Sequence, residues 1–534
     1  MKLTQVLSAV VGALVLCALW ALPSYAQEVQ SGAEVIYETN HDTSPALADL
    51  ATAAAEQPEQ PAESAIILPV RRTSTTETAA GAAVSEVDAV VQQLSGPRVS
   101  ATIGLNFDGL TNLDRAVPPD TNASVGATQV VETVNLHYQV FNKTTGASVL
   151  GPLAISGIWS GFNGTLCGKT SFSYSDPVVL YDKAAARWVI SILAFNNRFT
   201  SSSECYAVST TSDATGSYNR YEVPFGSNLP DYPKFAVWPD AYYATFNIFP
   251  SGGAFAGAEV CALNRAAMLA GSAMTAECFQ RTTADASFLP ADADGATAPA
   301  AGEPDFYVEL SSQSRSLLNL FKFHSDFITP ALATFTGPTT IAVAAYTQAC
   351  GAGGTCIPQP GTRQKLDSLG DRLMHRLAWR NLNGVEHLVV THSVKPGGSA
   401  AAGARWYDIV NPATAPTISQ QGTVIDGVRS LWMGSIAMDK AGDFALGFSR
   451  SSSSIRPGIA FTGRVPTDPI NTMEALKIIT AGTASQTSNR WGDYTSMSID
   501  PADDCTFWYA NEYLTATGTN WHTRLASLKF PGCH

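Results

Sequence analysis

Apolar and polar residues alternate with a period of two along many short stretches of this chain. Patterns of this kind, rich in β-branched and aromatic residues, predict β-strands. Helical periodicity is confined to short segments such as 265–269. The region from 101 to 534 is therefore predicted to be all-β. The clearest alternating stretches are residues 129–140, 178–181, 188–193, 242–248, 388–391 and 507–513.

One short pattern recurs through this region: an Asp near the start of a strand-like stretch, followed by alternating apolar residues and a polar turn. Recurrence of this kind predicts a fold built from similar β units, and hairpins at such spacing favour a β-propeller over a sandwich or barrel. Further units starting near Asp305 and Trp432 would give seven blades, with five or six as alternatives. The pattern occurs at Asp120, Asp176, Asp231, Asp371 and Asp493, and the first three of these are separated by 56 and 55 residues.

The first 26 residues combine Lys2, an apolar run over 6–22 and the small residues Ser24 and Ala26. This arrangement predicts a secretory signal peptide, cleaved after Ala26. We find no later stretch long and apolar enough to cross a bilayer. The mature protein is therefore expected to be secreted, extracellular or periplasmic, without a stable membrane anchor.

Residues 27–100 are rich in Ala, Glu, Gln, Ser, Thr and Pro, and their only aromatic residue is Tyr37. They contain eleven acidic residues against three arginines. Such a composition buries little apolar surface and predicts a disordered acidic linker or propeptide. The chain has no basic cluster of the kind that binds nucleic acid, so a nucleic-acid partner is not expected.

Eight of the nine cysteines follow the predicted signal peptide. In an exported protein, disulfides are the default state of cysteine, and no pair has the CxxC spacing of a zinc or redox site. Eight cysteines allow 105 connectivities. Pairing of sequence neighbours is the expectation, which joins Cys167 to Cys205, Cys261 to Cys278, Cys350 to Cys356 and Cys505 to Cys533.

The segment Ser209–Tyr218 is similar to the loose Asp-box turns of sialidase-like and arabinanase-like propellers. Together with the segments 118–122, 231–243 and 491–509, it makes the chain resemble a group of secreted bacterial propeller proteins with no settled activity. The resemblance implies a propeller fold over most of residues 101–534. The chain departs from true sialidases because it has no recognisable arginine triad and no repeated strict Asp boxes.

In a propeller the innermost strands line a central channel, so the recurrent aspartates are predicted to form an acidic ring. Converging carboxylates share protons, bind a cation such as Ca²⁺ or pair with arginine; the alternative is that each Asp only closes a turn. Catalytic candidates are Asp120, Asp176, Asp231, Asp371 and Asp493. Substrate-binding candidates are Arg372, His375, Arg490, Trp491, Tyr494 and Tyr232, of which Trp491 and Tyr494 are expected to be exposed at the channel mouth.

These features predict a secreted, glycan-directed protein. One hypothesis is a polysaccharide hydrolase or lyase that uses the channel-mouth carboxylates. The alternative is a noncatalytic extracellular module that binds or adheres to a polysaccharide or cell-surface glycan. Two carboxylates roughly 5–10 Å apart across an open pocket would favour hydrolysis, whereas a plugged or flat mouth would favour binding. Ca²⁺ is the one cofactor considered.

Overall fold

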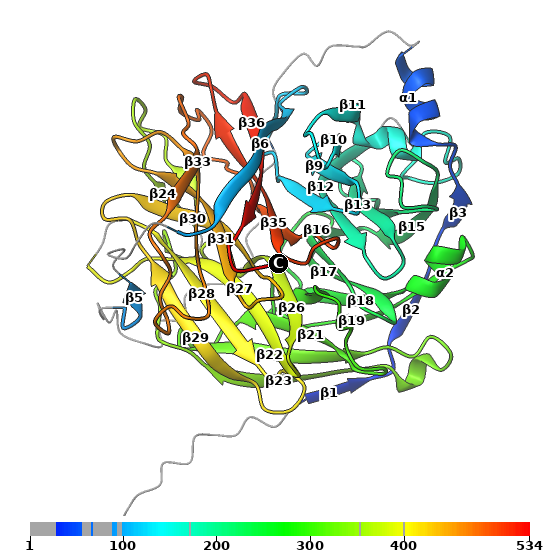
Figure 1. The fold of residues 1–534 in the computed structure, drawn as a ribbon. Helices are drawn as coiled ribbons and strands as arrows, with labels where there is room; N and C mark the ends of the chain where they lie inside the picture. Colours follow the sequence, from blue (N-terminus) through cyan, green and yellow to red (C-terminus); the bar gives the residue numbers. More distant parts are fainter. Residues whose placement is uncertain are drawn as a thin grey trace, which may run out of the picture.

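Four-stranded antiparallel sheets repeat along the chain (Figure 1). The computed structural model describes residues 28–55, 66–67, 88–92, 99–169, 172–351, 354–398 and 401–534. The predicted all-β class is confirmed for these residues. Short helices interrupt the strands at α2 (Arg265–Ala270) and at two 3₁₀ turns, Ile155–Trp159 and Pro330–Leu332.

We number the repeating units in chain order, and within the described residues there are seven. Unit 1 is β8 (Asn122–Val125), β9 (Gln129–Val134), β10 (His137–Asn142) and β11 (Ser148–Ala154). Unit 2 is β12 (Ser173–Asp182), β13 (Arg187–Phe195), β14 (Ser202–Ser209) and β15 (Tyr218–Gly226). Unit 3 is β16 (Asn228–Val237), β17 (Ala241–Pro250), β18 (Ala258–Asn264) and β19 (Thr275–Gln280). Unit 4 is β20 (Leu289–Ala293), β21 (Asp305–Leu310), β22 (Leu317–His324) and β23 (Thr334–Ala342).

Three further units complete the series. Unit 5 is β26 (Met374–Leu382), β27 (Val385–Val394), β28 (Gly403–Val410) and β29 (Thr417–Val424). Unit 6 is β30 (Ser430–Met438), β31 (Phe444–Ser451), β32 (Gly458–Arg464) and β33 (Lys477–Thr480). Unit 7 joins β34 (Ser496–Ile499), β35 (Thr506–Leu514) and β36 (Trp521–Lys529) to an earlier strand, β6 (Thr102–Thr111). A small extra pair, β24 (Thr355–Ile357) and β25 (Leu366–Asp367), precedes unit 5.

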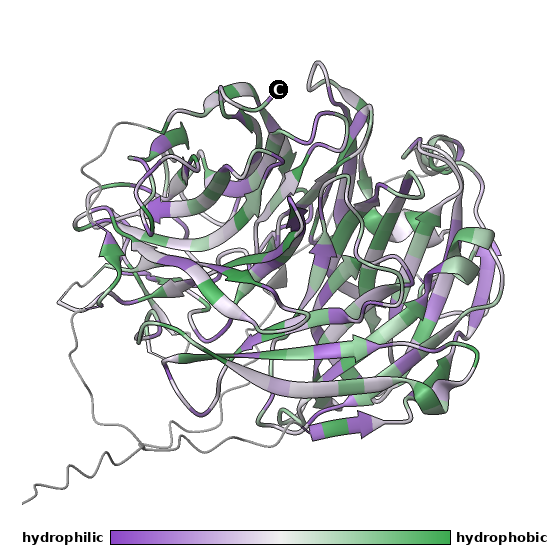
Figure 2. Ribbon diagram, turned by 60° about the horizontal axis from the view of Figure 1, so that its bottom comes forward, coloured by the Kyte–Doolittle hydropathy of each residue, from purple (hydrophilic) through white to green (hydrophobic). Residues whose placement is uncertain are grey.

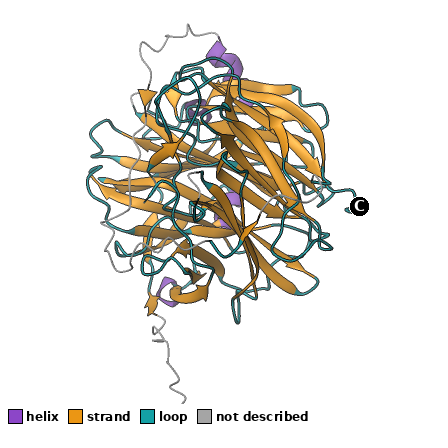
Figure 3. Ribbon diagram, turned by 90° about the vertical axis from the view of Figure 1, so that its left-hand side faces the viewer, coloured by secondary structure: helices purple, strands orange, loops and turns teal. Residues whose placement is uncertain are grey.

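The first strands of the units, such as β12, β16, β26 and β30, lie around the middle of the molecule (Figure 1). Strands make up most of the chain when it is seen from the side (Figure 3). Each first strand contacts the first strand of the next unit, in the order β8, β12, β16, β20, β26, β30 and β34, and β34 contacts β8. Between units 4 and 5 this contact is a parallel pairing of β20 with β26. None of the described sheets closes on itself as a barrel. The first strands therefore form a cycle of contacts around a common centre.

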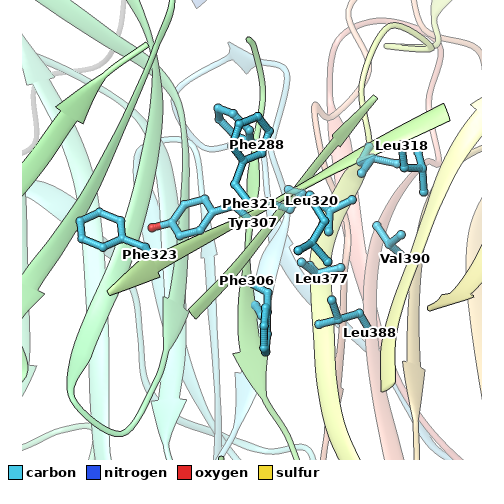
Figure 4. Packing of buried hydrophobic residues seen from close by; sticks show 14 of the residues in the cluster. Phe288, Phe306, Tyr307, Leu318, Leu320, Phe321, Phe323, Leu377, Leu388 and Val390 are labelled. Carbon is cyan, nitrogen blue, oxygen red and sulfur yellow. The ribbon is translucent and has the colours of Figure 1, made fainter. Parts of the chain in front are cut away.

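The hydrophobic core lies between neighbouring sheets. Inner strands such as β13 are buried along almost their whole length, which is expected where a sheet is covered on both faces. Apolar residues accordingly run along the strands in Figure 2. The largest cluster joins units 3, 4 and 5 and includes a group of aromatic rings, with Phe288 edge-on to Phe321 at a centroid distance of 5.0 Å (Figure 4).

The start of the predicted disordered linker is ordered, which corrects that prediction for residues 28–55. β1 (Glu28–Ser31) pairs with β23, β2 (Glu34–Tyr37) with β19, and β3 (Asn40–Thr43) with β15. α1 (Leu47–Ala55) then packs Leu47 into the core beside unit 1. The segment, which we call the N-terminal belt, therefore follows the outer edges of units 4, 3 and 2 (Figure 1).

The sequence analysis did not predict the belt, because its strands are held by main-chain hydrogen bonds. Amino-acid composition describes side chains and carries no information about such bonds. Later parts of the region 27–100 also meet the sheets. β5 (Val91–Gln92) lies parallel to β29, and β4 (Ile66–Ile67) lies parallel to β7 (Ala116–Val117). The predicted signal peptide and residues 56–65, 68–87 and 93–98 of the predicted linker lie outside the described residues.

Four disulfides join the sequence-neighbour pairs, so the predicted connectivity is confirmed. They are Cys167–Cys205, Cys261–Cys278, Cys350–Cys356 and Cys505–Cys533. Several disulfides in one chain favour an extracellular or secreted protein. The helices within the described ranges are all too short or too polar to cross a membrane.

Candidate functional site

The recurrent sequence pattern coincides with an irregularity of the backbone near the start of several first strands, where one residue has a left-handed conformation. β12, β16 and β30 each have a register shift next to a residue with left-handed φ: Asp176 at 56°, Tyr232 at 57° and Met433 at 47°. Asp120 has φ 50° just before β8. Asp tolerates this conformation better than most residues because its short side chain bonds locally.

Unit 3 departs from the predicted equivalence of the aspartates. Its left-handed position is held by Tyr232, so the half-buried Asp231 is one residue out of step with Asp120 and Asp176. Because successive side chains of a strand point to opposite faces, a shift of one residue changes the direction of the side chain. Asp231 is therefore not equivalent in position to Asp120 and Asp176.

Asp120, Asp176 and Asp493 are brought together and nearly enclosed. Their exposed fractions are 1%, 7% and 9%. Asn135 links the first two: its amide donates to Asp120 Oδ2 at 2.7 Å, and its carbonyl oxygen accepts from the Asp176 backbone N–H at 2.9 Å. The Asp493 backbone N–H donates to Asp120 Oδ1 at 2.7 Å. The Asp120 carboxylate and the backbone N–H groups of Asp176 and Asp493 therefore join unit 1 to unit 2 and to the segment before unit 7.

The electrostatics of this group follow from burial. Burial raises the pKa of Asp120 well above its usual value, and the neighbouring charges of Asp493 and Asp176 raise it further. Burial also raises the pKa of Asp176, with Asp493 adding to the effect. Arg490 forms an ion pair with Asp493 at 2.9 Å. Carboxylates buried together share protons or pair with a cation, and the ion pair with Arg490 is of the second kind.

A stack of cations and rings fills the space beside these carboxylates. Lys234 Nζ lies 3.4 Å from the ring centre of Tyr232 and 3.9 Å from that of Tyr494, as in a cation–π contact. The Arg372 guanidinium lies 4.4 Å from the Tyr232 ring and pairs with Asp371 at 3.0 Å. Burial lowers the pKa of Lys234 to about 7, against the opposing effect of the nearby carboxylates. All four residues of the stack are at most 2% exposed, so they do not line an open channel.

The aromatic residues predicted to be exposed at the channel mouth are buried, so that expectation is wrong. Trp491, Tyr494 and Tyr232 have exposed fractions of 0%, 1% and 2%. Trp491 donates its indole N–H to Ser449 Oγ at 2.9 Å and packs against Trp432. Tyr232 and Tyr494 enclose Lys234 instead of facing solvent. Their apolar faces are used in packing.

A cavity of about 340 Å³ lies toward the other ends of the inner strands. Its walls come from β8, β12, β20, β26 and β34, so five units contribute. Ala296 and Ala298, which follow β20, line the cavity and are exposed. The cavity therefore opens to solvent at the loop after β20. His375 is the one predicted site residue in its wall.

Ion pairs dominate the cavity wall. Arg376 pairs with Asp292 at 3.1 Å and with Asp294 at 2.5 Å. Asp504 pairs with Arg380 at 2.6 Å. The half-buried Lys183 donates from Nζ to the carbonyl oxygen of Ala293 at 2.9 Å. The wall therefore presents charged groups of both signs in fixed positions.

Burial shifts the pKa values of several cavity groups. It raises the pKa of Asp292 to about 6, although Arg376 opposes the rise. It lowers the pKa of Lys183 to about 8, although Asp294 opposes the fall. His375 has a pKa well below its usual value because of burial and the nearby charges of Lys234 and Arg376. At neutral pH, His375 is therefore uncharged.

Asn122 fixes the orientation of His375. The Asn122 Oδ1 accepts from the Val179 backbone N–H at 3.1 Å, so its Nδ2 is the atom that faces His375 Nε2, at 3.1 Å. Nε2 must then accept, which places the proton of the neutral ring on Nδ1. His375 can therefore act as a hydrogen-bond donor through Nδ1.

The sequence analysis missed the charged groups of the cavity, because it followed only aspartates at the starts of strands. Asp292 and Asp294 come at the end of β20, in the run Ala291-Asp292-Ala293-Asp294-Gly295. Carboxylates two residues apart on a strand share one face. That spacing was the available signal. Lys183 and Arg376 carry no comparable local pattern.

Ca²⁺ was considered as one possible partner of the recurrent aspartates, and binding would require their oxygen atoms to converge. Among the described residues, two groups have ligand atoms close enough to share one ion, and neither includes a predicted aspartate. Both contain cysteines that are joined in disulfides, Cys261–Cys278 and Cys505–Cys533. A disulfide sulfur is not the thiolate that binds a metal, so these groups do not suit a metal ion either.

Comparison with known proteins does not place the chain in a family. No family model and no curated protein matches it. Among solved structures, the WD40 domain of SCAP from fission yeast aligns with 10% identity over 76% of this chain and 79% of that chain, with a TM-score of 0.30. Exo-β-1,3-galactanase from Phanerochaete chrysosporium aligns with 9% identity over 80% and 99%, with a TM-score of 0.31. A subtype N10 neuraminidase-like protein of A/little yellow-shouldered bat/Guatemala aligns with 10% identity over 70% and 99%, with a TM-score of 0.33. Similarity at this level assigns neither family nor activity.

Proposed function

We propose that this protein is a secreted seven-bladed β-propeller that binds a saccharide in its central cavity. In this proposal residues 1–26 are the signal peptide and residues 101–534 form the propeller, with units 1–7 as its blades. The cyclic contacts of the first strands support the blade count. The four disulfides support export.

The observation that carries the proposal is the open cavity at the centre. Its volume of about 340 Å³ falls within the range of roughly 300–1,000 Å³ that is usual for small-molecule sites. Carboxylates of Asp292 and Asp294 can accept hydrogen bonds from hydroxyl groups. The half-buried Tyr181 lines the same cavity, and its ring packs against Trp188. Polar groups beside an aromatic ring are the surroundings that a sugar requires.

The burial of the predicted acidic ring argues against hydrolysis by these aspartates and favours binding in the cavity instead. Asp120, Asp176 and Asp493 are nearly enclosed and are engaged with Asn135, Arg490 and the backbone. A general acid or a nucleophile must reach its substrate, and carboxylates held in this way do not. We therefore propose that the predicted acidic ring holds the blades together.

Hydrolysis within the cavity is the second candidate, on one observation. Burial raises the pKa of Asp292 to about 6, and Asp294, just after the end of β20, pairs with the same Arg376 guanidinium. Two carboxylates in different surroundings can divide the roles of acid and base. Both are bound to Arg376, which is why binding remains the first candidate.

Incubation of the mature protein with plant, algal and bacterial polysaccharides tests both candidates. Retention on one polymer, without new reducing ends or unsaturated products, is the expected result. New reducing ends that disappear in Asp292→Asn would make the hydrolase candidate correct. Chelation of divalent cations is expected to leave retention unchanged. Failure to bind or cleave any polymer in the panel would contradict the proposed function.

A further inference from the structure

The cavity wall is electrically balanced, although it carries many charges. Apart from His375 and Tyr181, the ionisable lining groups are the basic Lys183 and Arg376 and the acidic Asp292, Asp294 and Asp504. Arg380, just behind the wall, pairs with Asp504 and supplies the third positive charge. His375 is neutral because burial lowers its pKa. The three positive and three negative groups therefore cancel.

Every nitrogen of the two guanidinium groups already donates a hydrogen bond to the protein. Arg376 donates from Nε to the Met497 carbonyl oxygen at 3.0 Å, and its Nη1 and Nη2 bond to Asp292 and Asp294. Arg380 donates from Nε to the Met438 carbonyl oxygen at 2.8 Å, and both of its terminal nitrogens bond to Asp504. Recognition of a carboxylate normally uses the paired N–H groups of an arginine, and here the charge of each guanidinium is already paired with carboxylates of the protein.

Lys183, the third positively charged group, does not provide a binding site for an anion in place of the two arginines. Lys183 Nζ is bonded to the Ala293 carbonyl oxygen. Burial lowers its pKa to about 8, and Asp294, Asp292 and Asp504 act on it in the opposite sense. An anionic group brought beside Lys183 would also lie close to these carboxylates. A like charge in a buried site is strongly disfavoured.

We propose that the cavity selects a neutral sugar and rejects its anionic and cationic forms. This inference rests on the proposed function and names the substrate class of the same site. Lone pairs on the paired carboxylates still accept hydrogen bonds from hydroxyl groups, whereas a charged substituent meets no unpaired counter-charge. Burial of a charge without a partner costs several kcal/mol. The balance of the wall thus acts as a filter on ligand charge.

Calorimetric titration with matched sugars tests the filter. Galactose, galacturonate and galactosamine share one ring and differ in charge, as do glucose, glucuronate and glucosamine. We expect the wild-type protein to bind the neutral form of at least one series about tenfold or more tightly than either charged form. Equal or tighter binding of a charged form would overturn the inference and leave the proposed saccharide function intact. Absence of binding by all six sugars would overturn both.

Two substitutions should change the charge preference of the cavity in opposite directions, one toward anionic and the other toward cationic sugars. Asp294→Asn removes one negative charge and releases Arg376 Nη2, so affinity for the uronate should rise about tenfold relative to the neutral sugar. Lys183→Met removes one positive charge, so the amino sugar should gain instead. Asp49→Asn, on the exposed side of α1, makes the same charge change far from the cavity and should alter neither ratio.

Circular dichroism and thermal unfolding identify a variant that has lost its fold. If one substitution unfolds the protein, the other still tests the inference, because each variant has its own predicted change in relative affinity. Unchanged relative affinities in a folded Asp294→Asn or Lys183→Met variant would contradict the filter.

Discussion

Glu132 shows how a single buried carboxyl makes stability depend on pH. It lies on β9, is fully buried, and accepts from the Leu110 backbone N–H of β6 at 2.9 Å, thereby joining units 1 and 7. Gly109 is required beside it, because a Cβ there would lie 2.2 Å from Glu132 Oε2. Burial raises the pKa of Glu132 to about 7.

A raised pKa in the folded state means that the folded protein holds a proton that the unfolded chain releases. The stabilising effect is complete below the ordinary Glu pKa and is lost as the pH rises through about 7. At roughly 1.4 kcal/mol per pKa unit, the loss is up to about 3 kcal/mol. Glu132→Gln should remove this part of the pH dependence between about pH 4 and pH 8.

Urea unfolding of the wild-type protein and Glu132→Gln at a series of pH values checks this prediction. Asp49→Asn, which alters an exposed carboxylate, serves as the control and should keep the wild-type slope. An unchanged slope in Glu132→Gln would show that Glu132 does not hold a proton in the folded protein.

For single residues, the sequence predicted which aspartates share a backbone position better than it predicted whether side chains are buried or exposed. Asp120 and Asp176 were found from the recurrent pattern because a left-handed residue before a strand favours Asp. Their burial had no local signal, since it depends on Asn135 and Arg490 from other units or distant loops. Trp491 was placed at an exposed mouth for the same reason: the residues that cover it, such as Trp432, are distant in sequence.

Among the elements, the N-terminal belt makes the clearest prediction. Three four-residue strands occupy the outer edges of β23, β19 and β15. Exposed strand edges promote pairing between molecules. Deletion of residues 28–43 should therefore lower the melting temperature and cause concentration-dependent self-association.

Size-exclusion chromatography and hydrogen exchange measure the effect of this deletion. Amide protons of β15, β19 and β23 should exchange faster, whereas those of β33, which the belt does not cover, provide an internal control. A monomeric truncated protein with wild-type exchange in these strands would contradict an edge-covering role. The belt could not be predicted because pairing across some 180 residues, as in β3 with β15, leaves no local pattern.

For the whole molecule, closure of the last unit is the feature that holds the ends together. Unit 7 combines β6, which precedes unit 1 in the chain, with β34–β36. The Cys505–Cys533 disulfide spans 28 residues within this unit, and Cys350–Cys356 spans only 6. Loop-closure entropy predicts losses of about 3.5 and 2 kcal/mol when these bonds are removed.

Double Ser variants of each pair, unfolded in guanidinium, compare the two bonds. The variant that lacks Cys505–Cys533 should be the less stable by more than about 1 kcal/mol. The reverse order would show that strain or residual structure outweighs loop closure.

The all-β class and the four disulfides were predictable from composition and spacing. The recurrent pattern predicted similar β units around a centre, in agreement with the cycle of first strands. The cavity and its charged wall arise from contacts between units, which the sequence pattern does not encode.

The central claim is that a saccharide occupies the cavity, and blocking the cavity tests it most directly. Ala296 lines the cavity and is exposed, whereas its neighbour Thr297 is exposed but is not part of the wall. Binding of galactose, glucose and mannose should be measured by calorimetry for the wild type, Ala296→Trp and Thr297→Trp. We predict that Ala296→Trp weakens binding of the tightest of these sugars about tenfold or more and that Thr297→Trp leaves it unchanged. Wild-type affinity in a folded Ala296→Trp variant would contradict the account, because the sugar would then bind elsewhere.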